Sequence, residues 1–240
     1  MDKSSDRRTD GRKPDELRPI SAKVGVVKKA DGSAMFRIGD TIAYAAVYGP
    51  RELYPKFMQD PTKGILRCRY NMMPFSGSGD RVRPGPSRRS TEISLVTAKA
   101  LLPVLNLEEF PNAVIDVFID MPQTDAGTRC AGICAAAMAL ADAGIFMRDL
   151  VSAVAVGMVN GKLFADLNYE EESTEGEVAD IPVAFIPKTG ELTLLQLDGG
   201  ITKPELIKAL ELGKKVCREV YALQKATLKE KYGGESGEED

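Results

Sequence analysis

Alternating apolar and polar positions predict β-strands along much of the chain. Residues 33–38 and 41–48 flank Gly39-Asp40, and this pattern predicts a hairpin. A second hairpin is predicted around Asn160-Gly161, between strands at 150–159 and 162–169. Further strands are expected at 66–72, 113–120, 182–187 and 191–198.

Apolar residues recur at helical spacing in three places. One helix is expected at about 88–105 with Ser87 as its N-cap, and another at about 126–143. The second is apolar on nearly all sides, which predicts burial against a sheet. The last helix begins with the capping box Thr202-x-x-Glu205 and runs to about residue 232. Hairpins precede helices twice, which indicates a mixed α and β fold with two similar halves.

Changes in composition mark the ends of the folded region. Residues 1–18 are charged and rich in turn formers, so we expect an extended N-terminal arm. Residues 19–232 contain no convincing linker and are expected to form a single domain. The acidic tail at 233–240 is expected to be disordered.

Composition and charge narrow the function classes. With 240 residues, 43% of them hydrophobic and 28% charged, the chain has the composition of a globular protein. A net charge of −3 excludes a general polycation, so binding of nucleic acid would need local clusters of arginine. The four cysteines form no CxxC pair and are expected to be reduced. Neither a signal peptide nor a membrane span is evident, so we expect a cytoplasmic protein.

The chain contains no histidine. This excludes Ser-His and Cys-His nucleophile pairs, HExxH metal sites and histidine proton relays within the chain. Any chemistry must therefore use carboxylates, arginines, backbone amides or a metal held by carboxylates.

Two predicted helices begin with arginines, although that end of a helix dipole is already positive. Arg88 and Arg89 lie in the first turn of one helix, and Gly127-Thr128-Arg129 opens the next. Free backbone N–H groups, a close-approaching glycine, a hydroxyl and a forked guanidinium together favour a bound phosphate. The alternative is a capped helix whose Arg129 pairs with a neighbouring acid.

A wider arginine cluster lies between positions 67 and 89. Its members are Arg67, Arg69, Arg81, Arg83, Arg88 and Arg89, and between these positions only Asp80 offsets their charge. Arginine suits bidentate contact with phosphate, and Tyr70 could stack on a base. The alternatives are a solvated face or a network of salt bridges between subunits.

An acidic stretch, NYEEESTEGEVADIP, separates two predicted strands. Most of it is expected to be a solvated loop. Asp180 differs because it directly precedes the strand-like IPVAFI. A carboxylate held there beside arginines could act as a general acid or hold a divalent metal.

Several stretches together resemble the ribonuclease PH family, and in particular the catalytic RNase-PH-type subunits of the archaeal exosome. The resemblance covers about residues 8 to 232. It is carried by RTDGRKPDELRPI, LRCRYNMMPFS, PGPSRRSTEIS, DAGTRCAG, ALADAGI, ADLNYEEE and ADIPVAF.

The resemblance implies a phosphorolytic 3′-to-5′ exoribonuclease, in which inorganic phosphate releases nucleoside diphosphates from single-stranded RNA, with Mg²⁺ as the expected metal. It implies an α/β (α+β) fold of two βαβα-like halves, related to a ribosomal-protein domain. It also implies a ring of six in which active subunits alternate with inactive homologues, and RNA-binding cap proteins on one face. The alternatives are a homohexameric tRNA-processing ribonuclease PH and a non-catalytic RNA-binding ring subunit.

The family's motifs assign roles to particular positions. Gly127, Thr128 and Arg129, with Arg89, match the phosphate site, and Arg88 with Arg89 match the pair that holds the RNA backbone. Arg67 and Arg69 match the RNA path, with Tyr70 beside them. Asp180 matches the second of two catalytic acids and is the expected metal ligand. Related subunits have an aspartate where this chain has Thr174, and Glu172 is the candidate for the first acid.

Overall fold

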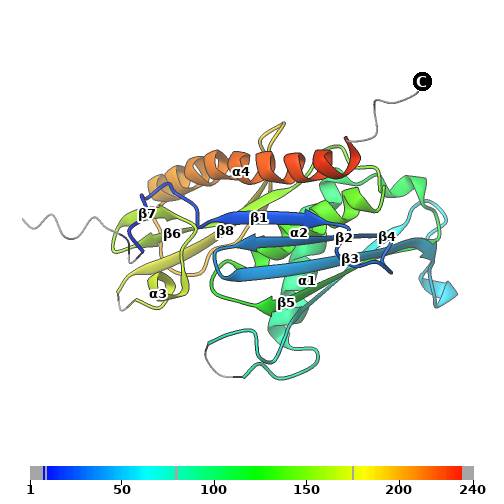
Figure 1. The fold of residues 1–240 in the computed structure, drawn as a ribbon, viewed down its shortest axis with the longest axis horizontal. Helices are drawn as coiled ribbons and strands as arrows, with labels where there is room; N and C mark the ends of the chain where they lie inside the picture. Colours follow the sequence, from blue (N-terminus) through cyan, green and yellow to red (C-terminus); the bar gives the residue numbers. More distant parts are fainter. Residues whose placement is uncertain (1–7, 9, 79–80, 175, 234–240) are drawn as a thin grey trace, which may run out of the picture.

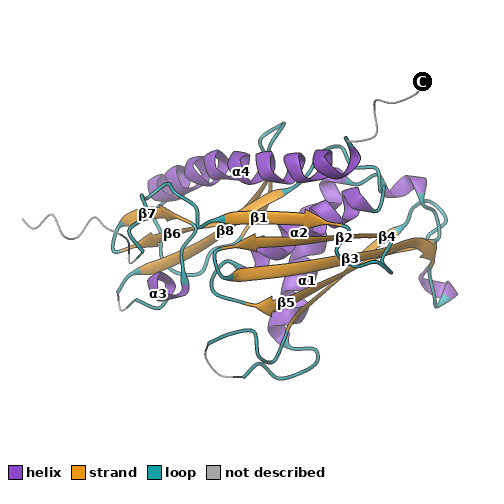
Figure 2. Ribbon diagram, in the orientation of Figure 1, coloured by secondary structure: helices purple, strands orange, loops and turns teal. Residues whose placement is uncertain are grey.

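Two β-sheets form the frame of the protein in the computed structural model, which describes residues 8, 10–78, 81–174 and 176–233 (Figures 1 and 2). The strand order of the first sheet is β1-β2-β3-β5-β4, and that of the second is β7-β6-β8-β9. All neighbouring strands are antiparallel except β4 and β5, which are parallel. The strands are β1 (Ile20–Val24), β2 (Gly32–Ile38), β3 (Thr41–Glu52), β4 (Ile65–Met72), β5 (Ala113–Gln123), β6 (Ser152–Val159), β7 (Lys162–Ala165), β8 (Val178–Ile186) and β9 (Glu191–Leu195).

The α-helices are α1 (Arg88–Leu101), α2 (Thr128–Asp142), α3 (Tyr169–Glu172) and α4 (Lys203–Tyr232), and short 3₁₀ turns cover Lys56–Met58, Leu102–Val104 and Leu107–Glu109. Helix α2 packs on β2, β3 and β5 of the first sheet and also on β6 of the second. Helix α4 lies along β1, β6 and β8 and so bridges the two sheets (Figure 1). No helix among the described residues is both long enough and apolar enough to cross a membrane.

Helix α2 is the centre of the core, as its apolar sequence predicts. Its side chains are buried from Cys130 through Leu140. The end of α2 lies so close to β2 that a Cβ on Gly32 would stand 2.1 Å from the backbone nitrogen of Ala143. One cluster of buried side chains includes residues of both sheets.

Most of the predicted elements are present, and the predicted mixed α+β fold is confirmed. The expected strand 162–169 is too long: β7 ends at Ala165, because Asp166 turns the backbone with φ +53° and Asn168 caps α3. The first helix ends at Leu101 instead of about 105, since the 3₁₀ turn that follows contains Pro103. Strand β1 and helix α3 were not predicted. All four cysteines are free and buried, as expected.

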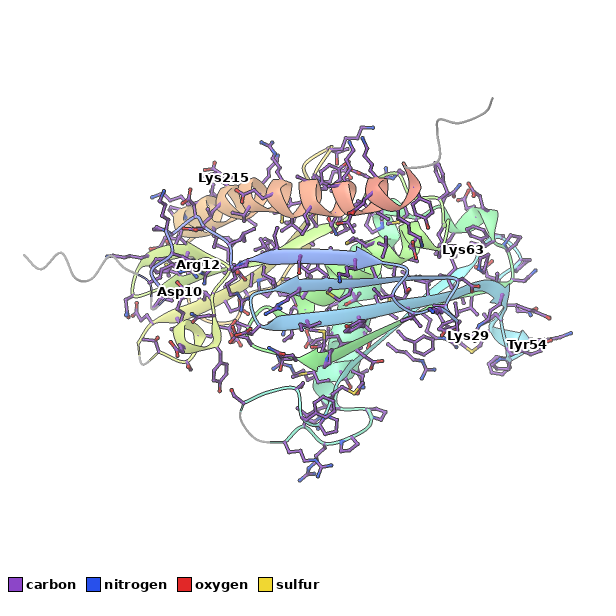
Figure 3. All side chains as sticks on the ribbon, viewed as in Figure 1. Asp10, Arg12, Lys29, Tyr54, Lys63 and Lys215 are labelled. Carbon is purple, nitrogen blue, oxygen red and sulfur yellow. The ribbon has the colours of Figure 1, made fainter. Side chains whose placement is uncertain are left out.

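The described part of the N-terminal arm lies against β7 and α3, at the end of the molecule where Figure 3 labels Asp10 and Arg12. The side chain of Arg8 is fully buried. It donates to both carboxylate oxygens of Glu171, at 2.8 and 2.6 Å, and to the carbonyl oxygens of Ala165 and Asp166. The arm is therefore fastened to the second sheet. The expected disorder of the acidic tail concerns residues 234–240, which lie outside the described residues.

Candidate active site

A cavity of about 320 Å³ lies where four segments of the chain meet. Its walls come from the end of β4, the loop that leads into α1, the connection between β5 and α2, and helix α3. In Figure 1 this loop projects from the first sheet, while α3 lies beside the second. The cavity contains Arg89, Thr128 and Glu172, three residues that the sequence assigned to one site.

The start of α1 has the predicted cap. The Ser87 hydroxyl accepts from the Ser90 backbone N–H at 3.0 Å, and the Ser90 hydroxyl accepts from the Ser87 N–H at 2.8 Å. Arg88 and Arg89 follow in the first turn, and both are exposed. Neither forms an ion pair with any acid in the part of the chain that the structure describes. Two unpaired guanidinium groups at the positive end of a helix form a strong anion-binding position.

The start of α2 supplies a second such position. Gly127 precedes the helix in the left-handed conformation with φ +66°, which an L side chain adopts only with strain. Thr128 is buried at the cavity wall, and the N–H groups of the first turn have no partner within the helix.

The guanidinium of Arg129 is held by two residues that sequence reasoning missed. Its Nη1 donates to Gln196 Oε1 at 2.6 Å and lies 3.9 Å from Glu92 Oε1. Gln196 in turn donates to Glu92 at 2.6 Å. Glu92 therefore lies at ion-pair distance from Arg129, as in the alternative of a helix whose Arg129 pairs with a neighbouring acid, but this long and partly exposed contact neutralises Arg129 only weakly. Gln196 and Glu92 lie 104 residues apart, and no local signal in the sequence links them.

Asp180 lies on β8 opposite Gly157 of β6, and its backbone pairs with that of Asp198. Its Oδ1 is buried and has no hydrogen-bond partner among the described residues. Burial raises the pKa of Asp180 to about 6, and the charge of Asp198 adds to this, whereas Arg129 and Arg89 act against it. Asp180 is therefore held in the field of the same arginines that flank the two anion positions.

Glu172 is an acid on the wall of the cavity. Burial raises its pKa to about 7, and the charge of Asp180 contributes in the same direction. Thr174, by contrast, is exposed and its hydroxyl donates to the carbonyl oxygen of Glu170. The position of Glu172 on the cavity wall supports it, rather than a residue at position 174, as the first acid.

Replacement of Glu172 by Gln should raise the melting temperature above pH 7. In the folded protein the pKa of Glu172 is about 7, against an ordinary value of 4.5, so between these values the folded state binds more protons than the unfolded state. The contribution of Glu172 to the free energy of unfolding therefore falls as the pH rises from about 4.5 to 7. The glutamine variant carries no charge at this position, so its free energy of unfolding does not fall for this reason. We expect the variant to melt roughly 7–14 °C higher at pH 8 and at the same temperature as the parent at pH 4.

Differential scanning calorimetry without phosphate, RNA or divalent cations measures this difference. Glu170→Gln, an exposed change on the same helix, is the matched control. An equal shift at pH 4 and pH 8 would show that packing, and not the charge of Glu172, causes it.

Arg67 and Arg69 lie outside the cavity, on the opposite face of β4. Arg67 pairs with the buried Asp116, which also accepts from Arg51 at 2.5 Å. Burial alone would raise the pKa of Asp116, but the hydrogen bonds from the two arginines hold it below its usual value. The guanidinium of Arg69 stands 6.0 Å from the centroid of the Phe118 ring and lines an adjoining cavity of about 370 Å³.

Tyr70 does not have the predicted environment. Only 4% of the residue is exposed, and its ring packs near Gly132 of α2. A base can stack only on an accessible ring face, so the stacking prediction for Tyr70 is wrong. The exposed aromatic residue of this cavity is Tyr169, on the helix that sequence analysis missed.

Behind the cavity, a buried network joins the N-terminal arm to α3. Arg18 pairs with Asp166 at 2.6 Å and with Asp125 at 2.6 Å. The other carboxylate oxygen of Asp125 accepts from the backbone N–H of Tyr169 at 3.1 Å. The arm thus fixes both the connection into α2 and the start of α3.

Comparisons with known proteins agree with this arrangement. Residues 16–146 match the 3′ exoribonuclease family, domain 1, and residues 149–216 match domain 2 of that family. The boundary between the two matches falls between α2 and β6, where the chain passes from the first sheet to the second.

Full-length relatives give the same result. The chain is 54% identical over 228 residues to the exosome complex component Rrp41 of Methanopyrus kandleri, covering 95% of this chain and 94% of that protein. It is 57% identical over 226 residues to Rrp41 of Pyrococcus abyssi, covering 94% and 90%. The crystal structure of rice Rrp46 superposes with a TM-score of 0.80 at 25% identity, covering 92% of this chain and 100% of the rice chain. With this fold, this cavity and these relatives, the chain belongs to the RNase PH family of 3′ exoribonucleases.

Proposed function

We propose that this chain is the phosphorolytic 3′-to-5′ exoribonuclease subunit of an exosome, and that its cavity is where phosphate attacks the RNA 3′ end. The family and the relatives named exosome complex component Rrp41 support the reaction class and the complex. The observation that carries the proposal is a single cavity lined by Arg89 from the start of α1, Thr128 from the start of α2 and the acid Glu172. Asp180 does not line this cavity, but its carboxyl group lies in the field of Arg129 and Arg89, and its charge acts on Glu172.

The reaction brings two anions together, and the site is suited to hold both. Inorganic phosphate binds at Gly127, Thr128 and Arg129 with Arg89, and the last phosphodiester of the RNA binds at Arg88 and Arg89. Held in line, the phosphate oxygen attacks the phosphorus and the 3′-oxygen of the preceding nucleotide leaves. No protein nucleophile is required, which agrees with a chain that lacks histidine.

The acids assist the leaving oxygen. With a pKa of about 6, Asp180 is protonated in a useful fraction of molecules near neutral pH and can donate its proton to the departing 3′-oxygen. The negative charge of ionised Asp180 in turn raises the pKa of Glu172, which keeps its proton to a higher pH than Asp180 does. The arginines stabilise the charge that develops on the phosphoryl oxygens.

The residues of the site also fit Mg²⁺. The buried Oδ1 of Asp180 has no partner among the described residues, and Mg²⁺ is usually bound by one or two carboxylates together with substrate phosphates. The described residues contain no group of three or more potential ligand side chains, so a site made by protein alone is not indicated. Asp180 would hold the ion, which would supply positive charge beside the phosphate oxygens.

The chain acts within an RNase PH-type ring with other subunits and RNA. We propose that it alternates with an inactive homologous subunit in a ring of six, and that RNA-binding cap proteins cover one face. We also propose that this ring works in the cytoplasm, because four free, buried thiols suit a reducing compartment.

The decisive experiment is to express the chain with its homologous partner and to incubate the ring with 5′-labelled single-stranded RNA, with and without inorganic phosphate. We expect shortening from the 3′ end and release of nucleoside diphosphates only when phosphate is present. The chain alone should be poorly active. Full activity of the chain as a homohexamer would support the tRNA-processing alternative, and RNA binding without any phosphate-dependent cleavage would support the non-catalytic one.

The affinity for RNA should fall with rising salt concentration, partly because Arg67 and Arg69 on the outer face of β4 contact RNA phosphates. Replacement of Arg67 and Arg69 together by Ala should reduce the slope of log affinity against log salt by about 1.4, because each contact with a single strand contributes about 0.7. Fluorescence anisotropy of labelled RNA over a range of salt concentrations measures the slope. Arg218→Ala, an exposed change on α4, is the control. An unchanged slope in the double variant would mean that these arginines do not touch RNA.

A further inference from the structure

The cavity has two walls of different character. Arg83 and Arg89 line it from the loop and the start of α1, and both are exposed. Helix α3 forms the facing wall with the sequence Tyr-Glu-Glu-Glu, of which Tyr169 and Glu172 line the cavity. A sugar–phosphate backbone is attracted to these arginines and repelled by Glu172 when that residue is ionised. The wall formed by α3 therefore suits the uncharged part of a nucleotide, its base.

Tyr169 presents the ring that such a base requires. Among the described residues, the aromatic side chains that line the cavity are Tyr70 and Tyr169. Tyr70 is 4% exposed, whereas Tyr169 is 52% exposed. Stacking on an aromatic ring accepts every base, which is what an enzyme that removes successive nucleotides needs.

The ring is mounted on a short helix that is fastened from behind. The backbone N–H of Tyr169 donates to Asp125, which is paired with the buried Arg18. At its other end α3 is held by the buried ion pair of Glu171 with Arg8, at 2.6 Å. A ring on a fixed helix loses little conformational freedom when a ligand binds, so more of the stacking energy is retained as affinity.

We propose that Tyr169 is the stacking face for the base of the 3′-terminal nucleotide of the RNA. This inference rests on the proposed function, because it concerns the same cavity. Tyr169 and Glu172 are three residues apart on one helix, so both face the same side of it. The same helix thus holds the base of the terminal nucleotide and presents an acid to the cavity where its phosphodiester is attacked.

The test uses the assembled ring without phosphate and an RNA whose 3′-terminal nucleotide lacks its base. For the parent ring, removal of this base should weaken binding about ten-fold, as should Tyr169→Ala with the complete RNA. The two changes together should cost no more than one of them, because each removes the same stacking contact. Tyr169→Phe should recover most of the affinity, since the ring remains. Tyr54→Ala, a change at the far end of the molecule in Figure 3, is the control.

A fluorescence measurement gives an independent result. The chain contains no tryptophan, so Tyr169→Trp introduces a single reporter whose emission, after subtraction of the parent ring, should be quenched by complete RNA and not by the RNA without its terminal base. Tyr54→Trp should respond to neither.

Two results would overturn the assignment of Tyr169. One is a ten-fold penalty for the missing base that persists in Tyr169→Ala, and the other is unchanged affinity of Tyr169→Ala for the complete RNA. In either case a parent ring that still releases nucleoside diphosphates with phosphate leaves the proposed function intact. A parent ring that releases none removes the function, whatever Tyr169 does.

Discussion

Asp180→Asn should lower kcat by about 10²–10⁴-fold while changing the affinity for RNA by less than about two-fold. In the proposed reaction the carboxyl group acts on the leaving 3′-oxygen, either by donating its proton or by holding an ion beside it, and both contributions would arise mainly in the transition state. Asparagine has nearly the same shape, so the pairing of β8 with β6 and the bridge to Asp198 should persist. Because phosphorolysis is reversible, addition of RNA tails from nucleoside diphosphates should fall by the same factor.

Steady-state kinetics of the assembled ring in both directions, with RNA binding measured separately, provide this comparison. Asp40→Asn, at the exposed turn between β2 and β3, is the matched control. If the Asp180→Asn ring assembles, binds RNA and keeps its activity in both directions, Asp180 does not take part in the reaction.

Arg129→Ala should raise the KM for phosphate about ten- to hundred-fold and leave the affinity for RNA nearly unchanged. A hydrogen bond to a charged group contributes about 1.5–3 kcal/mol, and each 1.4 kcal/mol corresponds to a factor of ten. The effect falls on phosphate because Arg129 stands at the start of α2, whereas the arginines proposed for RNA stand on α1 and β4.

A variant of Gln196 tests the same prediction independently. Gln196 Oε1 accepts from the guanidinium of Arg129 at 2.6 Å and so positions it, but Gln196 is not itself proposed to touch phosphate. Gln196→Ala should therefore raise the KM for phosphate by a smaller factor than Arg129→Ala. Arg129→Lys keeps the charge without the fork and should fall between the two. An unchanged KM for phosphate in Arg129→Ala would remove this residue from the phosphate site.

The sequence contained strong information about the two helix starts. A serine cap after two prolines and a glycine before an apolar helix are local signals, and the structure has both. The position of Tyr70 was also encoded, because it shares the alternation of Leu66 and Cys68, which are buried, and not that of Arg67 and Arg69. The error was to group Tyr70 with its neighbour in the chain, although adjacent residues of a strand point to opposite faces.

The features of the site that the sequence did not predict are those that depend on contacts between segments far apart in the chain. Helix α3 has four residues, too few for a periodic pattern, and it is held by Arg8 from 163 positions earlier. Gln196 meets Arg129 only because β9 ends beside the start of α2. Neither contact leaves a spacing that can be recognised in the sequence, so the cavity's outline was predictable only from the family resemblance.

The attachment of the arm to α3 has a consequence for synthesis of the chain on the ribosome. Arg8 is made 163 residues before its partner Glu171. Until then the arm has nowhere to dock, and neither Asp166 nor the N–H of Tyr169 is available to complete the network around Arg18 and Asp125. The first sheet and α2 can fold while translation continues, but the catalytic cavity closes only when the second half emerges and captures the arm. A nascent chain halted before Glu171 would have the start of α2 in place while Glu172 and Asp180 were still to be made.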